Sequence, residues 1–292
     1  MIEDLRDKPS LRHNDILKLN FIRSPGGYFY RRHYRAGLRS HIMEVLKWRD
    51  WEQEEKGVVK DRLTWFPKAR PIKMLRLFRS RFRSRDEAEE ELRRVKVIVS
   101  YLGPSLLATS EEFLVSYQLL GQTEILLCGL QEYVDGEILD PWTRFDNDHL
   151  AFLFTRMEPD NQQERVTHTD QWIRAVRKKA KNFIEKNKEM ILGANLVPDL
   201  AGIGNLLLTR NGDIKLVDIN NVSNVTFGTT IQLDDRGYPV CDKSIEALFR
   251  LEQDFVGPSN YSESDIYRTF LDPQRMKEVN AIQDAFHQAM TT

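Results

Sequence analysis

Hydrophobic and polar positions along the chain favour strands in the first half and helices in the second half. Residues 15–24 and 28–35 flank a Pro-Gly-Gly turn signal at 25–27, which predicts a β-hairpin. After Ser40, apolar residues recur at a helical spacing, which predicts a helix over 41–55. The apolar stripe of this helix consists of Ile42, Val45 and Leu46.

The next elements in the first half are expected to be a strand and a long helix. Residues 69–78 predict the strand, which ends in the basic run 79–85. The helix is capped by Ser84 or Asp86 and stops where Gly103 is followed by a proline. Its apolar stripe, close to the 3.6-residue period, comprises Ala88, Leu92, Val95, Val99 and Leu102.

Residues 110–120 and 124–134 predict two further strands, after which the pattern becomes helical. The longest helix is expected over 169–192 and ends at Gly193. A β-type module follows at 206–219, because an Asn-Gly pair at its centre is a strong hairpin turn signal. The apolar face of the long helix comprises Trp172, Val176, Ala180, Phe183 and Ile184.

The charge of the chain is unevenly distributed, although its formal net charge is only −1. Residues 1–100 contain 25 Lys and Arg against 15 Asp and Glu, while the remaining residues contain 18 against 29. The near-zero total argues against a protein that coats nucleic acid or membranes. The basic run 79–85 has two interpretations: an edge strand whose charges block aggregation, or a surface that attracts an anionic substrate.

The cysteines and the apolar runs exclude several classes of protein. Cys128 and Cys241 lie far apart without a His/Cys cluster, so neither a zinc site nor a disulfide framework is indicated. The chain opens with charged residues, and no apolar run approaches the ~20 residues that span a bilayer. We therefore expect a cytoplasmic protein without a transmembrane segment, while peripheral contact with a membrane stays open.

The stretch 197–221 carries the most informative polar residues. Asp199 lies in a loop after the long helix, Asn205 stands at the start of a strand, and Asp218 ends the next strand. Because the predicted hairpin folds back on itself, Asn205 and Asp218 are expected to meet. Carboxylate and amide oxygens are the ligands that Mg²⁺ prefers, and a second carboxylate can accept a proton from an attacking hydroxyl. The alternative is that Asp and Asn serve here only as turn formers.

In these residues the chain resembles the protein-kinase superfamily, whose catalytic loop reads Asp-Leu-x-x-x-Asn and precedes a hairpin that ends in a metal-binding Asp. Asp199-Leu200, Asn205 and Asp218 match these elements in order. The resemblance implies that Asp199 is the catalytic base and that Asn205 and Asp218 bind magnesium. It also implies that the cofactors are ATP and Mg²⁺.

The resemblance extends to residues outside that stretch. Residues 131–138 look like the hinge between two lobes, whose backbone receives the adenine ring, and Lys73 resembles the phosphate-binding lysine. Glu91, near the apolar stripe of the following helix, is the expected ion-pair partner of Lys73. The adenine-binding hinge residues implied by this resemblance are Glu132, Tyr133 and Val134.

The resemblance therefore implies a two-lobed α+β fold. Residues 1–130 would form an N-terminal lobe, with an antiparallel sheet and a helix that bind ATP. Residues 131–292 would form the hinge and a mainly helical catalytic lobe.

Departures from the usual kinase pattern favour an atypical branch. Asp199 and Asn205 are six positions apart where the usual loop has five, residues 197–198 are Val-Pro where the usual loop has His-Arg, and residues 219–220 are Ile-Asn where the family has Phe-Gly. No GxGxxG motif lies near the N-terminus. These features are similar to lipopolysaccharide-core, sugar or aminoglycoside kinases.

The expected activity is transfer of the γ-phosphoryl group of ATP to a hydroxyl group. The acceptor would be a small molecule, a glycan or a lipid headgroup, and nucleic acid is not the expected acceptor. Two alternatives stay open: a catalytically inactive pseudokinase that serves as a binding module, and a binder of anionic ligands or nucleic acid through the basic N-terminal part.

Overall fold

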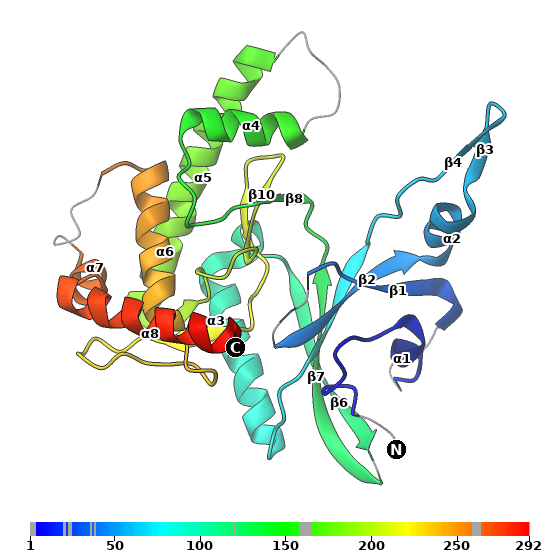
Figure 1. Ribbon diagram of the computed structural model, residues 1–292, viewed down its shortest axis with the longest axis horizontal. Helices are drawn as coiled ribbons and strands as arrows, with labels where there is room; N and C mark the ends of the chain where they lie inside the picture. The colour runs from blue at the N-terminus through cyan, green and yellow to red at the C-terminus, as the bar shows by residue number, and fades with distance from the viewer. Residues whose placement is uncertain are drawn as a thin grey trace. The chain divides into compact units, whose positions relative to one another are not determined.

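The computed structural model shows a mixed α/β protein with an antiparallel sheet and several helices (Figure 1). It describes residues 4–157 apart from positions 20, 21, 23, 24, 36, 38 and 120, and then residues 165–258 and 264–291. None of the helices in this part of the chain is both long enough and apolar enough to cross a membrane.

The chain divides into two compact units. The first contains the described residues up to Arg93 together with Thr109–Tyr133, and the second contains Arg94–Ala108 and the residues from Val134 onward. The expected assignment of 1–130 and 131–292 to an ATP-binding lobe and a catalytic lobe stays a prediction.

The first unit is built on a five-stranded antiparallel sheet with the order β1-β2-β5-β7-β6. The strands expected over 69–78, 110–120 and 124–134 are confirmed as β5, β6 and β7. Apolar side chains from β2, β5 and β7 form its core with the N-terminal segment, since burying apolar area is the main favourable term in folding. The strand bounds are β1 Tyr28–Arg32, β2 Ser40–Lys47, β5 Lys73–Phe78, β6 Ser110–Leu119 and β7 Gln122–Glu132.

The helix predicted over 41–55 is wrong in its first half, because this half forms β2 and only the second half is helical, as α2 (Trp48–Lys56). β2 pairs with β1 on one side and with β5 on the other. The strand is buried on both faces, so its apolar residues do not alternate and periodicity alone cannot distinguish it from a helix.

The hairpin predicted at the Pro-Gly-Gly turn is also wrong. The segment before the turn contains the short helix α1 (His13–Leu17), and Pro25–Gly27 form one 3₁₀ turn before β1. β1 therefore pairs forward with β2 rather than back across the turn. Positions 20, 21, 23 and 24 of the expected first strand lie outside the described residues.

The basic run 79–85 does not form an edge strand. β5 ends at Phe78 and lies inside the sheet, between β2 and β7. Arg79 donates from Nη1 to the carbonyl oxygen of Arg6 (2.7 Å), and Arg81 pairs with Asp7 (2.7 Å). Two of these arginines therefore fasten the N-terminal segment.

The long helix of the first half is α3 (Arg85–Leu106), as expected. Ser84 accepts a hydrogen bond from the backbone N–H of Glu87 (3.2 Å), which satisfies one of the donors that a helix start leaves unpaired. At Gly103 the backbone leaves the helical conformation (φ 65°, ψ 175°), so the regular helix stops there as expected, and a further short turn begins at Pro104 beyond this kink.

A two-stranded hairpin, β3 (Val58–Lys60) and β4 (Leu63–Trp65), follows α2. Asp61 and Arg62 form its turn with φ values of 54° and 61°, and both signs are those of a two-residue hairpin turn. β3 and β4 pair only with each other among the described strands. We call residues 58–68 the arm.

The second unit is mainly helical and is organised around α5 (Arg165–Ala194). All five apolar residues of the face expected for this helix are buried, and α5 packs against α4, α6 and α7. The other helices are α4 Asn147–Met157, α6 Val240–Phe255, α7 Asp265–Phe270 and α8 Pro273–Thr291.

The two cysteines lie in different units, Cys128 in β7 of the first unit and Cys241 in α6 of the second. Both are buried free thiols, and burial raises the pKa of each to about 12.

Two small sheets complete the second unit. The predicted hairpin at 206–219 is confirmed: β10 and β11 pair in the register Leu206↔Leu216, and β8 joins β10 on its other side. The other sheet consists of β9 and β12. Their bounds are β8 Gly136–Ile138, β9 Leu196–Pro198, β10 Leu206–Thr209, β11 Ile214–Leu216 and β12 Val222–Asn224.

Candidate active site

Asp199 is placed by the pairing of β9 with β12 in the second unit. β9 follows directly after α5, and its last residue, Pro198, lies opposite Val222 of β12. The backbone N–H of Asp199 donates to the carbonyl oxygen of Asn221 (2.8 Å), which continues the ladder by one bond. Asp199 is therefore the first residue of the loop that leaves the sheet.

The carboxylate of Asp199 is held by three hydrogen bonds. Oδ1 accepts from the backbone N–H groups of Ala201 (3.1 Å) and Gly202 (3.0 Å). Oδ2 accepts from the side-chain amide of Asn221 (2.8 Å). Since both oxygens have fixed donors, the carboxylate keeps one orientation, which is the preorganisation that a catalytic group requires.

Asn205 is tied to the same loop. Its amide Nδ2 donates to the backbone carbonyl oxygen of Asp199 (2.9 Å), so Oδ1 points away from that bond. Gly202 packs on the amide: a Cβ at this position would lie 2.4 Å from Nδ2 of Asn205. Only glycine therefore leaves room for the observed position of Asn205.

The hairpin returns the chain to Asn205, as the sequence predicts. Gly212 takes the positive φ (75°) that the turn requires, and the backbone N–H of Val217 donates to the carbonyl oxygen of Asn205 (2.8 Å). Asp218 is the next residue, so it lies beside the strand position opposite Asn205. Its negative charge is close enough to Asp199 to act on the pKa of that carboxyl.

Burial is the largest cause that raises the pKa of Asp199 above its ordinary value, and the negative charge of Asp218 is the second. The hydrogen bonds from Gly202, Asn221 and Ala201 oppose this rise because they stabilise the charged form. A carboxylate with a raised pKa is a better proton acceptor, which suits general-base chemistry.

Sequence reasoning missed two residues beside Asp199. Asn221, which binds the carboxylate, could have been suspected from its position three residues after Asp218. Tyr238 gave no local signal: its pKa is raised to about 12, first by burial and then by the negative charge of Asp199. Tyr238 accepts a hydrogen bond from Gln283 of α8 (3.1 Å), which connects the C-terminal helix to this region.

The donor set of the site suits magnesium. Asn205 offers Oδ1 and Asp218 offers its carboxylate, and both residues are half-buried. Mg²⁺ is usually bound through one or two protein oxygen ligands together with waters and substrate phosphates. Within the described part of the chain, no group of three or more His, Cys, Asp or Glu residues could hold a metal ion.

Lys73 and Glu91 belong to the first unit. Lys73 begins β5, where it lies opposite Glu132 of β7 and Val45 of β2. Over the residues that the structure describes, Lys73 and Glu91 do not form an ion pair. The sheet thus brings Lys73 beside Glu132 and not beside its expected partner.

Of the expected hinge residues, Glu132 is the last residue of β7, and Tyr133 and Val134 follow it. The backbone N–H of Glu132 donates to the carbonyl oxygen of Thr109 (2.8 Å), and the hydroxyl of Thr109 donates to the Glu132 carboxylate (2.9 Å). Tyr133 and Val134 have no regular secondary structure, and the division between the two units falls between them.

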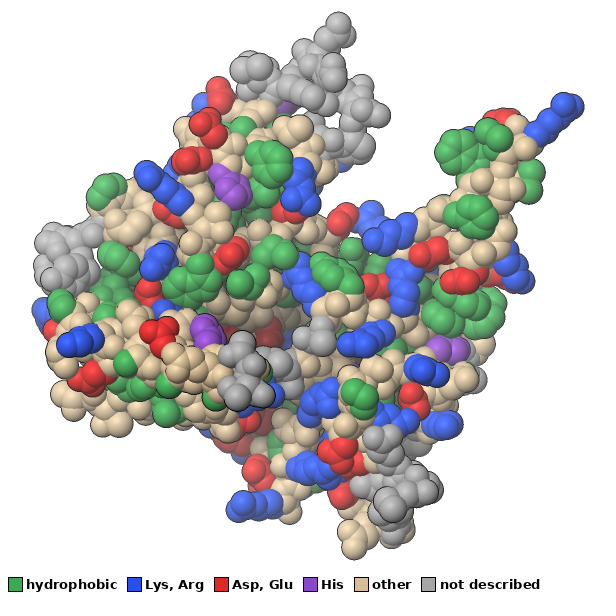
Figure 2. All heavy atoms as spheres, viewed as in Figure 1, with side chains coloured by type: hydrophobic (Ala, Val, Ile, Leu, Met, Phe, Trp, Pro, Cys, Tyr) green, Lys and Arg blue, Asp and Glu red, His purple; other side chains and the backbone are tan. Residues whose placement is uncertain are grey.

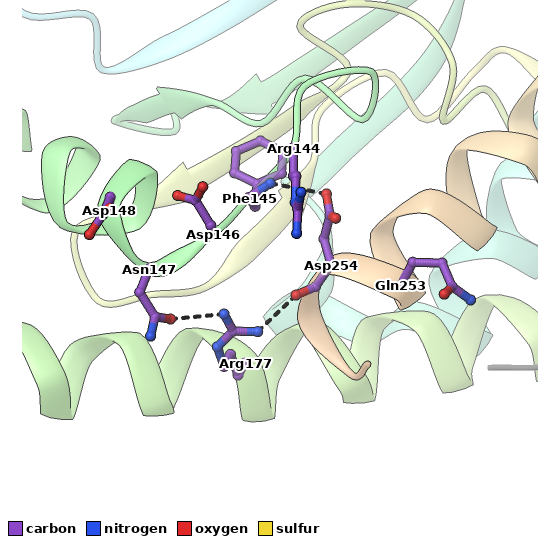
Figure 3. A pocket seen from close by; sticks show the side chains of 8 residues that line it. All are labelled: Arg144, Phe145, Asp146, Asn147, Asp148, Arg177, Gln253 and Asp254. Carbon is purple, nitrogen blue, oxygen red and sulfur yellow. Dashed lines mark hydrogen bonds between the residues drawn. The ribbon is translucent and has the colours of Figure 1, made fainter. Parts of the chain in front are cut away.

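A groove of about 430 Å³ in the second unit is lined by none of the candidate site residues (Figure 3). Arg177 donates to the carbonyl oxygen of Asp254 (2.8 Å) and to Oδ1 of Asn147 (2.9 Å), and the backbone N–H of Phe145 donates to the Asp254 carboxylate (3.0 Å). These groups join the start of α4 to α5 and α6, so they have a structural role. The lining consists of Arg144, Phe145, Asp146, Asn147, Asp148, Arg177, Gln253 and Asp254.

Comparisons with known proteins identify no family for this chain. No family model matches it, and no curated protein matches it. Among solved structures, it is similar to the ROP18 kinase domain in complex with AMP-PNP and sucrose, with a TM-score of 0.37 and 10% sequence identity. The match covers 91% of this chain and 83% of that chain. A similarity this distant carries no conclusion about function, which has to come from the site geometry.

Proposed function

We propose that the protein is an ATP- and Mg²⁺-dependent phosphotransferase that acts on a hydroxyl group. The observation that supports this function best is the loop and hairpin of residues 199–218. There, one carboxylate is fixed by three hydrogen bonds, and an amide is tied to the same loop beside a second carboxylate. Phosphoryl transfer needs little covalent chemistry from the protein and depends on such positioning and on charge neutralisation.

In this mechanism Asp199 accepts the proton of the acceptor hydroxyl as its oxygen attacks the γ-phosphorus. The new O–P bond forms while the bond between the γ-phosphorus and the bridging oxygen breaks, and ADP leaves with the bridging oxygen. Asn205 Oδ1 and the Asp218 carboxylate would hold Mg²⁺, which supplies positive charge to the phosphate oxygens. The raised pKa of Asp199 favours its role as acceptor of the proton.

The first unit would contribute the nucleotide contacts. Lys73 would bind the phosphates, and the backbone around Glu132, Tyr133 and Val134 would receive adenine. Glu91 keeps the proposed role of orienting Lys73, which requires a side-chain rearrangement because the two do not pair in the described structure. The acceptor would be a small molecule, a glycan or a lipid headgroup, as in the atypical kinases that the sequence resembles.

The test separates magnesium-dependent nucleotide binding from turnover. Thermal unfolding is measured with ATP in the presence of Mg²⁺ and of EDTA, because a ligand that binds only the native state stabilises it by about 2.7 kcal/mol at 100 times its Kd. Asp218→Ala should abolish the Mg²⁺-dependent part of the shift. Asp199→Ala should keep that shift and lose about 10²- to 10⁴-fold in acceptor-dependent ADP release.

Asp284→Ala is the matched control, because Asp284 is an exposed carboxylate on α8. It should behave like the parent in both measurements. If Asp218→Ala responds to Mg²⁺-ATP as the parent does, the proposed site is wrong.

A catalytically inactive pseudokinase is the second candidate. The observation that favours it is the missing ion pair between Lys73 and Glu91 in the part of the chain that the structure describes. Tight Mg²⁺-ATP binding without ADP release across a broad panel of hydroxyl acceptors would support the pseudokinase over the enzyme.

A further inference from the structure

The arm, residues 58–68, is an unusual segment of the first unit because every one of its residues is exposed. Its strands pair only with each other among the described strands, and an isolated two-stranded hairpin is at best marginally stable in water. Figure 1 shows it extending from the end of α2. Such a segment is expected to gain stability from a partner.

The exposed side chains of the arm are largely apolar and aromatic. Val59 is 74% exposed, Leu63 60%, Trp65 58% and Phe66 64%. The pairs Val58↔Trp65 and Val59↔Thr64 lie on opposite faces, since neighbouring positions of a strand point to opposite sides. Apolar groups therefore cover both faces of the hairpin. A protein that docks on one face would leave the other in water, whereas lipid can surround both.

Basic residues accompany these apolar groups. Lys60, Arg62 and Lys68 are exposed and make no ion pair within the described part of the chain, and Asp61 is the one acidic residue of the arm. Figure 2 shows hydrophobic and basic side chains together over this hairpin. Aromatic and aliphatic side chains with flanking Lys and Arg are the composition that binds the interface of an anionic bilayer.

The base of the arm is fixed to the rest of the first unit. The backbone N–H of Ala69 donates to the Glu54 carboxylate (2.9 Å), and its carbonyl oxygen accepts from Arg31 (3.2 Å). Arg31 and Glu54 also pair with each other (2.7 Å). At the other end Gly57 takes a φ of 77°, and a Cβ there would lie 2.5 Å from Cγ2 of Thr64. The exposed apolar groups are thus presented from an anchored base.

We propose that the arm binds the surface of anionic membranes, with Leu63, Trp65 and Phe66 entering the interface and Lys60, Arg62 and Lys68 contacting lipid phosphates. This inference is independent of the proposed phosphotransferase activity, because it concerns only the surface of the first unit.

The test is sedimentation of the full chain with vesicles of phosphatidylcholine alone and of equal parts phosphatidylcholine and phosphatidylglycerol. The parent should bind the anionic vesicles more tightly, and this preference should weaken as salt is raised. Trp65→Ser/Phe66→Ser should lower the affinity by at least about tenfold. Lys60→Gln/Arg62→Gln, which keeps the apolar groups, should lower it by about 10- to 30-fold.

Matched controls come from the second unit. Phe152 and Leu192 are 58% and 59% exposed, so Phe152→Ser/Leu192→Ser removes two apolar groups of similar exposure and should leave vesicle binding unchanged. All variants should keep the parent's thermal unfolding temperature, because the substituted side chains are exposed.

A second readout locates the insertion. Lipids with brominated chains should quench tryptophan fluorescence in the parent, and Trp65→Phe should remove this quenching. The proposal is overturned if Trp65→Ser/Phe66→Ser binds vesicles as the parent does, or if neutral and anionic vesicles bind equally. It is also overturned if quenching persists in Trp65→Phe, or if the arm instead forms a dimer of this chain without binding vesicles.

Discussion

Asp199 of the second unit shows how its surroundings favour the protonated form of a buried carboxyl group. The Asp199 carboxylate is held by donors on both oxygens, yet burial and the charge of Asp218 raise its pKa. The hydrogen bonds lower the pKa, but burial, the largest cause, and the repulsion from Asp218 together outweigh them. The site therefore holds two carboxylates close together at a cost that a bound cation would relieve.

The raised pKa of Asp199 predicts a pH dependence of stability. Between the ordinary value of 3.8 and the raised value, the native state keeps a proton that the unfolded state has lost, so the free energy of unfolding falls as the pH rises. Asp199→Asn lacks this loss. The stability of the variant relative to the parent should thus increase across that window and level off above it, as urea midpoints at several pH values would reveal.

Asp284→Asn provides the comparison for this pH series. Asp284 is exposed on α8, so its replacement controls for the removal of one carboxylate from the surface. A stability difference for Asp199→Asn that does not change with pH would mean that its pKa is not raised in the native state.

Gly202 is the residue that leaves room for Asn205, so its replacement tests the magnesium donor set. Gly202→Ala should displace the Asn205 amide, because the added Cβ would lie 2.4 Å from Nδ2. We expect the affinity for Mg²⁺-ATP to fall by about 10- to 100-fold, as when groups that orient metal ligands are removed. Isothermal titration calorimetry measures this change.

Gly228→Ala is the control for Gly202→Ala, since an added Cβ at Gly228 meets nothing within 4 Å. It should bind Mg²⁺-ATP like the parent. Equal affinities of Gly202→Ala and the parent would show that Asn205 does not hold the cation.

At the scale of elements, the β10–β11 hairpin depends on a tight turn that packs on α5. Gly212 has a φ of 75°, and a Cβ there would lie 3.0 Å from Cγ2 of Val176. Gly212→Ala should lower the free energy of unfolding by about 1 kcal/mol for the backbone conformation and by about 1 kcal/mol more for the contact with α5. Urea denaturation measures the sum.

Gly237→Ala separates the two contributions to that loss. Gly237 also has a positive φ (85°), but an added Cβ there meets nothing within 4 Å. This variant should lose only the backbone part. If it loses as much as Gly212→Ala, the contact with α5 contributes nothing.

At the scale of the molecule, a buried ion pair fastens α6 to α8 in the second unit. Arg275 donates from Nε to Asp242 (2.5 Å) and from Nη2 to its other oxygen (3.2 Å), and both side chains are buried. Arg275 also donates to the carbonyl oxygen of Gly228, in the segment between β12 and α6. One side chain thus connects two helices and the loop between the site and α6.

Arg275→Met should lower the stability of the second unit by about 3–5 kcal/mol, because it leaves the buried Asp242 charge without its partner. Far-UV circular dichroism during urea denaturation follows this unit, which holds most of the helix. Arg268→Met, at a position with a side chain that is 63% exposed, should change stability by no more than about 0.5 kcal/mol. Equal losses in the two variants would contradict the structural role of Arg275.

The sequence by itself determined the elements whose signals are local. The 206–219 hairpin follows from an Asn-Gly turn, the long helix α5 from a regular apolar stripe, and the strands β5, β6 and β7 from their composition. The meeting of Asn205 and Asp218 is also predicted locally, because the hairpin between them returns the chain to the start of its first strand. Turn chemistry and helical periodicity act over a few residues, so they can be found without the fold.

Only the tertiary structure decided those features that depend on contacts between residues far apart in the sequence. β2 is a strand because β1 and β5 pair with it, although its apolar spacing is that of a helix. Three further features depend on residues far apart in the chain. They are the position of Lys73 opposite Glu132 in the neighbouring strand, the approach of Tyr238 to Asp199, and the exposure of the arm. Long-range pairing and burial outweigh local propensity, which is why these features could not be predicted from the residues around them.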